Sequence, residues 1–471
     1  MKTLAAIFVQ TATTRLRVLL FLVLWLAYGS AINSSNLLEF DLQQIGVEAM
    51  VERGHFYLEG SSSPNLQTKG DVFEYNGHRY AAKQPGQFMA GSVVYFFLHK
   101  LGLSYVNNYL LTSALVTFFT TSLVLAASAA ALFGIALELT ADGRALFWPL
   151  AAALGYALAT TAFSYSGIAH HDALATGYVV IAFSFIFHLS RRSTTTGASY
   201  LEAAGAGVLL GLTITTSMLP FFMVILCSIY FFFLRRWQLL PLFLAGLLVD
   251  LLPLFFYDAV NFGNPFLLPN IAGAGMFADT FWHFDPKNFG DKVTFYGRAL
   301  ASYVPLFAVG LCGLSYYPRE IKRRSEFLTA IGVMIVLAAF VFNISSDGDC
   351  QFGPRYLLPA MPFACLGLVG YSYLSRSSER RLAAVAIVLT GALSFLVNLV
   401  GALRGTMNCP HGQNAFWNHV SSIARGEGRS YPLVLWLLVP LLISTALFMR
   451  NLSARIRAEA SPPSQPRADH S

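Results

Sequence analysis

The first residues that could do chemistry lie in Glu39-Phe40-Asp41, directly after an apolar run near the N-terminus. If that run spans a membrane, these carboxylates lie at the membrane surface beside an aromatic ring. Partial desolvation there favours the protonated form of a carboxylate and makes it a better general base. Asp41 also precedes a helical pattern that stops at Arg53-Gly54, so it can serve as a helix N-cap, the commoner role. The two roles are compatible, and the sequence leaves both open.

A candidate phosphate-binding lysine follows in the same segment. Asn76-Gly77 between aromatic residues predicts a tight hairpin turn, with His78 and Tyr80 on its second strand. Beyond the hairpin, Lys83 stands just ahead of Pro85-Gly86 and the start of a short helix. A fixed ammonium together with the free amides of a helix start can hold a phosphate. The alternative is a lysine whose ammonium reaches the lipid headgroups.

Two histidines and an aspartate are adjacent in His170-His171-Asp172, between two apolar runs. These residue types suggest a metal site. Adjacent residues on a helix point about 100° apart, so at most two of the three could share an ion. A polar helix cap is therefore the better interpretation, and a divalent metal remains an open alternative.

Arg355 is the only basic residue in the three short connections that the topology below places on the outer side. Gly353-Pro354 rigidly aims it at the start of the next apolar run, and Tyr356 follows it. An arginine in this position costs orientation energy, so an anionic partner is expected. That partner is either a lipid headgroup or a substrate phosphate.

Two of the five cysteines, Cys350 and Cys409, lie outside the apolar runs. The topology below places both on the outer side, where disulfides are permitted. A bridge between them would tie the Arg355 connection to the last outer segment and restrict its motion. Two free thiols are the equal alternative, because connectivity cannot be read from sequence.

The elements that must position these residues are membrane helices. The 471-residue chain is 55% hydrophobic and only 12% charged, whereas soluble domains contain roughly 25% charged residues. This composition excludes a soluble globular enzyme, a disordered chain and a zinc-finger-type nucleic-acid binder. A bilayer-spanning helix needs about 20 apolar residues. The sequence predicts an all-α polytopic membrane protein with about 12 transmembrane helices, at 18–32, 107–137, 145–164, 173–189, 201–217, 219–234, 239–257, 299–315, 327–343, 357–374, 382–402 and 432–449.

Basic residues lie mostly on one side of this arrangement. The inner connections and chain ends hold 19 basic and 8 acidic residues, and the outer segments hold 12 basic and 15 acidic. Because short cytoplasmic loops collect Lys and Arg, both termini are expected in the cytoplasm. The pI near 9.1 is then an orientation signal, and no nucleic-acid partner is expected. The first run could instead be a cleaved signal peptide; we favour a retained helix, and the remaining topology is unchanged either way.

Residues 1–458 are therefore expected to form one transmembrane domain, followed by a disordered Pro/Ser-rich cytoplasmic tail over 459–471. The apolar stretch 88–98 is too short to span and is expected to form a surface helix in the first outer loop. Asp250 is the one acidic residue well inside a span, and its role, structural or proton-linked, is open. Chemistry is expected outside the membrane, because the long polar segments all lie there, at 33–105, 258–298 and 403–431.

Together these patterns resemble bacterial GT-C glycosyltransferases of the protein-O-mannosyltransferase and aminoarabinose transferase group. The resemblance covers most of the chain and includes an Asp after the first span and a large first outer loop. It implies a polyprenyl-phosphate-linked sugar donor that enters from the bilayer of a bacterial inner membrane. Transfer with inversion to an extracytoplasmic glycan, lipid or protein acceptor is also implied. Three short motifs contribute: Lys83-Gln84-Pro85-Gly86, Asn261-Phe262-Gly263-Asn264-Pro265-Phe266 and Phe352-Gly353-Pro354-Arg355-Tyr356-Leu357-Leu358-Pro359.

The resemblance also implies site roles. In such enzymes the first-loop Asp is the proposed catalytic base, which maps to Asp41. Glu39 is the competitor, because this chain has Glu-Phe-Asp where some relatives have an Asp-Glu pair. Basic residues hold the donor phosphate, by position Lys83 and Arg355. No cofactor is certain, although a divalent metal fits the family. The remaining residues expected to contact substrate are Tyr356, His78, Tyr80, His171 and Asp172.

A twelve-span secondary transporter is the main alternative. Transporters carry paired charges inside the membrane, and here only Asp250 qualifies. They also do not need a 73-residue outer loop between the first two spans. A flippase-like partner or an assembly scaffold stays open on the sequence alone.

Overall fold

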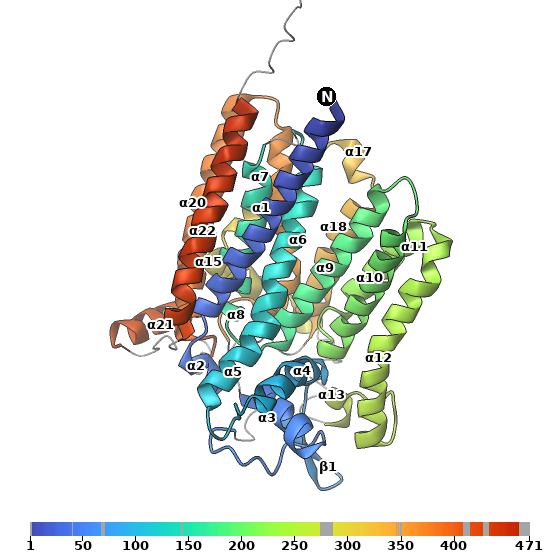
Figure 1. Ribbon diagram of the computed structural model, residues 1–471, viewed down its shortest axis with the longest axis vertical. Helices are drawn as coiled ribbons and strands as arrows, with labels where there is room; N and C mark the ends of the chain where they lie inside the picture. The colour runs from blue at the N-terminus through green and yellow to red at the C-terminus, as the bar shows by residue number, and fades with distance from the viewer. Residues whose placement is uncertain are drawn as a thin grey trace, which may run out of the picture.

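Long helices running roughly side by side dominate the computed structural model of this chain (Figure 1). The structure describes residues 2–39, 41–66, 71–142, 145–273, 286–344, 346, 348, 351–407, 415–426 and 433–460. Within these ranges the regular structure is helical apart from one two-stranded hairpin. The all-α polytopic class expected from composition is thus confirmed.

Eight helical segments in the described ranges are long and apolar enough to cross a membrane. A ninth is the pair α15 (Phe289–Tyr303) and α16 (Leu306–Leu314), if these two helices, bent by 106°, count as one span. The eight are α1 (Lys2–Ser30), the continuous α5 (Tyr109–Thr117), η2 (Phe118–Ser122) and α6 (Leu123–Leu139), α9 (His171–Arg191), α10 (Gly197–Thr216), η3 (Trp237–Leu239) with α12 (Leu240–Phe262), α18 (Ser325–Asn343), α20 (Ser377–Arg404) and α22 (Leu433–Ala460).

The other three predicted runs are helical but shorter or interrupted. A proline inside a helix removes a backbone hydrogen bond and clashes with the preceding turn. Pro359 and Pro362 accordingly lie in the interrupted run at 357–374, and Pro305 separates α15 from α16 in the bent pair described above. The three runs contain α7 (Phe147–Leu158) with α8 (Thr161–Tyr165), α11 (Phe221–Phe233), and η5 (Arg355–Ala360) with α19 (Met361–Leu366) and η6 (Gly367–Tyr373).

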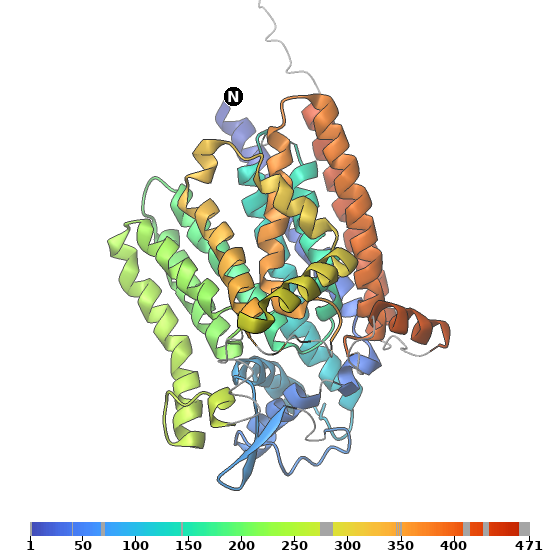
Figure 2. The same cartoon turned by 180° about the vertical axis from the view of Figure 1, so that it is seen from behind.

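Shorter elements gather mainly at the end of the bundle away from the N-terminus (Figures 1 and 2). The predicted hairpin is confirmed: Tyr75 pairs with His78, and Asn76 and Gly77 between them have φ angles of 49° and 80°, as in a type I′ turn. The helix that begins at Asp41 ends where the sequence predicts, since Gly54 is left-handed. These elements are α2 (Ser34–Glu39), α3 (Asp41–Glu48), η1 (Ala49–Arg53), β1 (Val72–Tyr75), β2 (His78–Ala81), α4 (Gly86–Lys100), α13 (Pro269–Ala272) and α21 (Ala415–Ala424), with η4 (Pro286–Asn288) and α17 (Arg319–Lys322) elsewhere.

Close helix packing directs α12 toward the same end of the bundle. A Cβ added at Gly207 of α10 would lie 2.0 Å from the Phe243 carbonyl oxygen of α12, and one at Gly246 would lie 2.4 Å from the Ala204 carbonyl oxygen. Only glycine permits such backbone contact. Beyond the end of α10, α12 reaches the hairpin, where Phe262 packs into one cluster with the aromatic residues of both strands. The chain then turns into α13, which completes the site described next.

Candidate functional site

Five segments far apart in sequence meet in one polar pocket at the end of the bundle away from the N-terminus. They are the β2–α4 connection, the start of α9, the α10–α11 connection, α13 and η5. The pocket is lined by Lys83, Gln84, His171, Asp172, Ser217, Met218, Leu219, Asn270, Arg355 and Tyr356. The two cations that the sequence predicts at a phosphate site therefore lie on the same pocket.

Lys83 is held by an ion pair. Its Nζ lies 2.7 Å from Oδ2 of Asp71, which immediately precedes β1, and the lysine side chain is only 13% exposed. The Lys83 ammonium, with a weaker contribution from Arg355, lowers the pKa of the half-exposed Asp71 carboxyl. The hairpin thus carries both members of the pair and fixes the ammonium at the pocket wall.

Arg355 has a different environment. Its Nη2 donates to the Tyr356 hydroxyl at 2.9 Å, and its guanidinium lies 4.5 Å from the centre of the same ring. The Tyr356 hydroxyl is also 3.0 Å from Ser346 Oγ. Among the residues that the structure describes, Arg355 has no carboxylate within ion-pair distance, and its Nε has no hydrogen-bond partner. Its charge is therefore available to an anion that enters the pocket.

The start of α9 provides a buried carboxylate. Asp172 is 2% exposed and its Oδ1 accepts a 2.7 Å hydrogen bond from Ser217. His171 Nε2 lies 3.4 Å from the same oxygen. His170 is the N-cap of α9, because its Nδ1 accepts from the Asp172 amide, so the predicted polar cap exists. Burial, together with the neighbouring His171, lowers the pKa of His170, which keeps it neutral.

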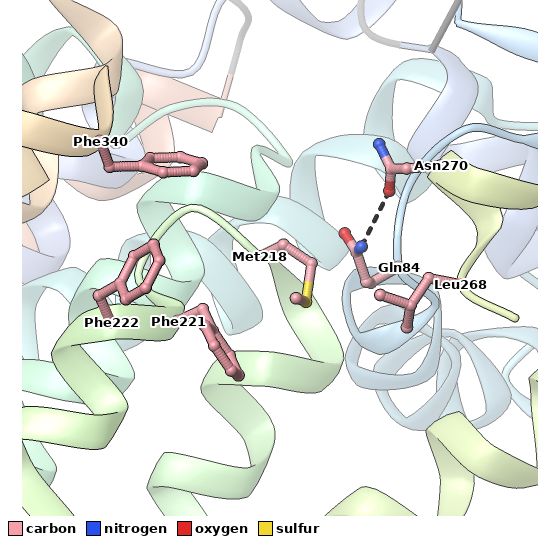
Figure 3. Close-up of a pocket in the computed structure, with 7 residues that line it drawn as sticks. All are labelled: Gln84, Met218, Phe221, Phe222, Leu268, Asn270 and Phe340. Carbon is pink, nitrogen blue, oxygen red and sulfur yellow. Dashed lines mark hydrogen bonds between the residues drawn. The ribbon is translucent and has the colours of Figure 1, made fainter. Parts of the chain in front are cut away.

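An apolar pocket adjoins the polar one and shares Gln84, Met218 and Asn270 with it. Figure 3 shows the Gln84 and Asn270 amides facing each other, with a 2.9 Å hydrogen bond from Gln84 to Asn270. Asn270 also donates to the Ala82 carbonyl at 3.3 Å. These hydrogen bonds hold the two amides in place at the polar end of the apolar pocket. The rest of the apolar pocket is lined by Phe221, Phe222, Leu268 and Phe340.

Two hydrogen bonds, both through Thr406, connect the segment that carries Glu39 and Asp41 to the segment that carries Arg355. In α2, Asn36 Oδ1 accepts from the Thr406 amide. The Thr406 carbonyl in turn accepts from the Phe352 amide at 2.7 Å, three residues before Arg355. Glu39 ends α2 and Asp41 begins α3. The side chains of both lie outside the described part of the structure.

Other predicted site residues lie away from the pocket lining or outside the described residues. His78 on β2 is paired with Glu59, with Nδ1 and Oε1 2.6 Å apart, and stacks on Tyr57. Tyr80 packs against Phe73 and Phe262. The strand that carries them leads directly to Lys83. Cys350 and Cys409, the two cysteines of the candidate disulfide, lie outside the described residues.

The sequence reasoning missed the apolar Met218 and Leu219 and three polar pocket residues: Gln84, Ser217 and Asn270. Each of the latter three is a neutral polar residue in a short connection, and such residues are common in turns for local reasons. Gln84 could have been found from its place inside Lys83-Gln84-Pro85-Gly86. Ser217 and Asn270 have no distinguishing signal, because their role depends on contacts distant in sequence.

No protein-family model and no curated protein matches the chain. Solved structures do. ArnT from Cupriavidus metallidurans bound to undecaprenyl phosphate superposes with a TM-score of 0.52, covering 94% of this chain and 73% of ArnT at 18% identity. The Archaeoglobus fulgidus oligosaccharyltransferase in complex with Zn and sulfate gives a TM-score of 0.52, covering 88% of this chain and 57% of that one at 15% identity.

Both of these proteins are membrane glycosyltransferases of the GT-C superfamily. The chain therefore shares the fold of these two proteins, as the sequence resemblance predicts, and identities of this size establish the fold alone. The oligosaccharyltransferase structure contains Zn. In the described part of this chain, no group of three or more His, Cys, Asp or Glu residues could hold a metal ion.

Proposed function

We propose that this protein is a membrane glycosyltransferase that moves a sugar from a polyprenyl-phosphate donor to an acceptor on the extracytoplasmic side. The observation that carries the proposal is the polar pocket with two cations, Lys83 and Arg355, next to an apolar pocket. A polyprenyl phosphate likewise has an anionic head and an apolar chain, one for each pocket. The undecaprenyl phosphate bound to ArnT, which has the same fold, supports this class of lipid.

The polar pocket suits a phosphate for electrostatic reasons. Arg355 offers a planar set of donors without a described carboxylate partner, and guanidinium groups bind phosphate through two parallel hydrogen bonds. Lys83 adds a point charge that Asp71 holds in position. Asp172 also lines the pocket and opposes a phosphate; its Oδ1 is turned to Ser217, from which it accepts a hydrogen bond. Lys83 and Arg355 are therefore the phosphate ligands in this proposal.

The apolar pocket suits the first prenyl units. Its aromatic lining comes from α11 and α18, through Phe221, Phe222 and Phe340. Both helices have large apolar side chains on their outer faces, among them Ile229 and Ile335, which are 44% and 62% exposed. Such exposed apolar side chains are expected where helices face lipid. A donor can thus place its head in the polar pocket while its chain continues toward the bilayer.

The reaction needs one base and two cations. Asp41 removes the proton from an acceptor hydroxyl, the hydroxyl oxygen bonds to the anomeric carbon, and the bond from that carbon to the phosphate oxygen breaks. Lys83 and Arg355 stabilise the charge that develops on the departing polyprenyl phosphate. Attack from the face opposite the leaving group inverts the anomeric carbon. Glu39, two residues earlier, is the alternative base.

Binding of undecaprenyl phosphate to purified protein tests the site. We expect Arg355→Ala to weaken binding about tenfold to a hundredfold, because a charge-assisted hydrogen bond contributes about 1.5–3 kcal/mol. Arg298→Ala removes an exposed outer arginine on α15 and should leave binding unchanged. Undecaprenol, which lacks the phosphate, should bind weakly to all three proteins. Equal undecaprenyl phosphate affinities for wild type and Arg355→Ala would refute the assignment.

A further inference from the structure

A separate cleft lies at the opposite end of the molecule, between α1 and α22, at the end where Figure 1 shows the N-terminus. It has a volume of about 410 Å³ and is lined by Thr14, Arg15, Val18, Leu19 and Asn451. Ligand pockets usually enclose about 300–1,000 Å³. The apolar runs of the two helices end near this level, at residues 18 and 449, with Arg15, Arg17, Arg450 and Arg455 beyond them, and Arg455 donates a hydrogen bond to the Thr13 hydroxyl. The cleft therefore lies where the bundle leaves the bilayer.

The lining changes from polar to apolar along α1. Thr14 and Arg15 lie one helical turn before Val18 and Leu19, and a turn advances about 5.4 Å. The polar pair is next to the end of the span, and the apolar pair is deeper. An amphiphile whose charged head stays at the membrane surface fits this gradient, whereas a free ion would use only its polar end.

Arg15 has an unused charge. It is exposed, and no residue that the structure describes forms an ion pair or hydrogen bond with it. Arg17, by contrast, turns inward against Gly134 and interacts with Glu138. Among the residues whose side chains the structure describes, none that lines the cleft is acidic, and Arg450 and Arg455 of α22 lie near it in sequence, on either side of Asn451. The electrostatic field of these arginines at the opening of the cleft favours an anion.

We propose that the cleft binds one anionic glycerophospholipid of the cytoplasmic leaflet. Its phosphate accepts hydrogen bonds from the Arg15 guanidinium, and an acyl chain packs along Val18 and Leu19. The cytoplasmic assignment follows from the excess of basic residues at this end of the chain. The site is distinct from the sugar-donor pocket, which lies at the other end of the bundle, and does not depend on glycosyl transfer.

Native mass spectrometry of delipidated protein tests the proposal, with phosphatidylglycerol and phosphatidylcholine of identical chains as probes. We expect one phosphatidylglycerol to be retained at least several-fold more strongly than phosphatidylcholine. Arg15→Gln should reduce that retention roughly tenfold, because it removes the phosphate ligand. Arg319→Gln makes the same charge change at exposed α17, outside the cleft, and should retain the lipid as wild type does.

Two further experiments distinguish lipid binding from the binding of a free anion and from a folding defect. Val18→Trp fills the apolar end at a half-exposed position and should reduce phosphatidylglycerol binding while leaving the charge intact. Glycerol phosphate, the head without chains, should bind far more weakly. The proposal would be overturned if the protein retained both lipids equally, or if Arg15→Gln and Val18→Trp retained phosphatidylglycerol as the wild type does. Glycerol phosphate that binds as strongly as the lipid would also overturn it.

Discussion

At the residue scale, the two pocket cations differ in what balances their charge. Lys83 has a carboxylate 2.7 Å away, whereas Arg355, among the described residues, contacts the hydroxyl and ring of Tyr356 and no carboxylate within ion-pair distance. An incoming phosphate must compete with the Lys83–Asp71 ion pair, whereas at Arg355 the carboxylates of Asp172 and Asp71 act through their field without an ion pair. Arg355 should therefore contribute more to donor binding than Lys83, although the sequence alone ranks them equally.

Arg355→Lys tests whether geometry matters as well as charge. We expect it to recover only part of the undecaprenyl phosphate affinity lost in Arg355→Ala, because a lysine ammonium cannot make two parallel hydrogen bonds or stack on Tyr356 in the same way. Titration of the three proteins side by side provides the measurement. Full recovery by lysine would mean that charge alone is recognised.

Sequence reasoning located charged residues of this pocket better than neutral ones. Lys83, Arg355 and Asp172 come from connections whose residue types are unusual at a membrane surface, and all three line the pocket. His78 and Tyr80 were assigned by their place in the loop. They lie on β2, where Tyr80 faces an aromatic cluster and His78 pairs with Glu59. Loop position does not determine which way a strand residue points.

At the element scale, hydropathy finds apolar runs but not their interruptions. All twelve predicted runs contain helix, yet eight form long apolar helices within the described residues. The run at 299–315 contains Pro305, where the chain bends by 106° between α15 and α16. Thr160, whose side chain accepts from the Ala162 amide, caps α8 and breaks the run at 145–164. Helix capping and proline determine where the helices in these runs end or bend, and mean hydropathy is insensitive to both.

Gly207→Ala tests the close contact that directs α12 to the site. The added Cβ would lie 2.0 Å from the Phe243 carbonyl oxygen, so the two helices must separate. We expect a destabilisation of about 1–3 kcal/mol, typical of overpacking, seen as a lower unfolding temperature in detergent. Gly197→Ala, in the same helix with nothing within 4 Å, is the control. Equal unfolding temperatures for the two variants would contradict the packing argument.

The docking of α21 should depend on pH through His419. Its Nε2 is 2.8 Å from the Gly405 carbonyl oxygen, and burial lowers the pKa of His419 from 6.5 to about 4, against a smaller opposing effect of that hydrogen bond. Because the unfolded segment binds the proton more readily, the stability present above about pH 6.5 falls as the pH drops toward 4, by up to about 3 kcal/mol.

Hydrogen exchange of residues 415–426 checks this dependence. Protection in the wild type should decrease between pH 6.5 and 4, and His419→Gln should show a flatter profile, since its amide does not titrate. Identical pH profiles for the two proteins would exclude His419 as the source.

At the scale of the whole molecule, distant parts of the chain meet at the end of the bundle away from the N-terminus. α1 begins and α22 ends at the other end (Figure 1), in agreement with termini on one side of the membrane. Near the site, Asn33 of the first outer segment donates to the Ala402 carbonyl at 2.9 Å. Asn36 accepts from the amide of Thr406, whose carbonyl accepts from Phe352. Such contacts between residues hundreds of positions apart cannot be read from one sequence; the GT-C resemblance implied only that Asp41, Lys83 and Arg355 act on one donor.

The most direct test of the central proposal is sugar transfer by membranes that contain the protein, using a radiolabelled polyprenyl-phosphate sugar. We expect wild type to consume the donor, Asp41→Asn to lose about a hundredfold or more of the rate while still binding undecaprenyl phosphate, and Glu39→Gln to remain active. Activity in Asp41→Asn together with inactivity in Glu39→Gln would move the base to Glu39. Activity in both variants would contradict the assignment of the base, and a wild-type protein that consumes no polyprenyl-phosphate sugar would contradict glycosyl transfer itself.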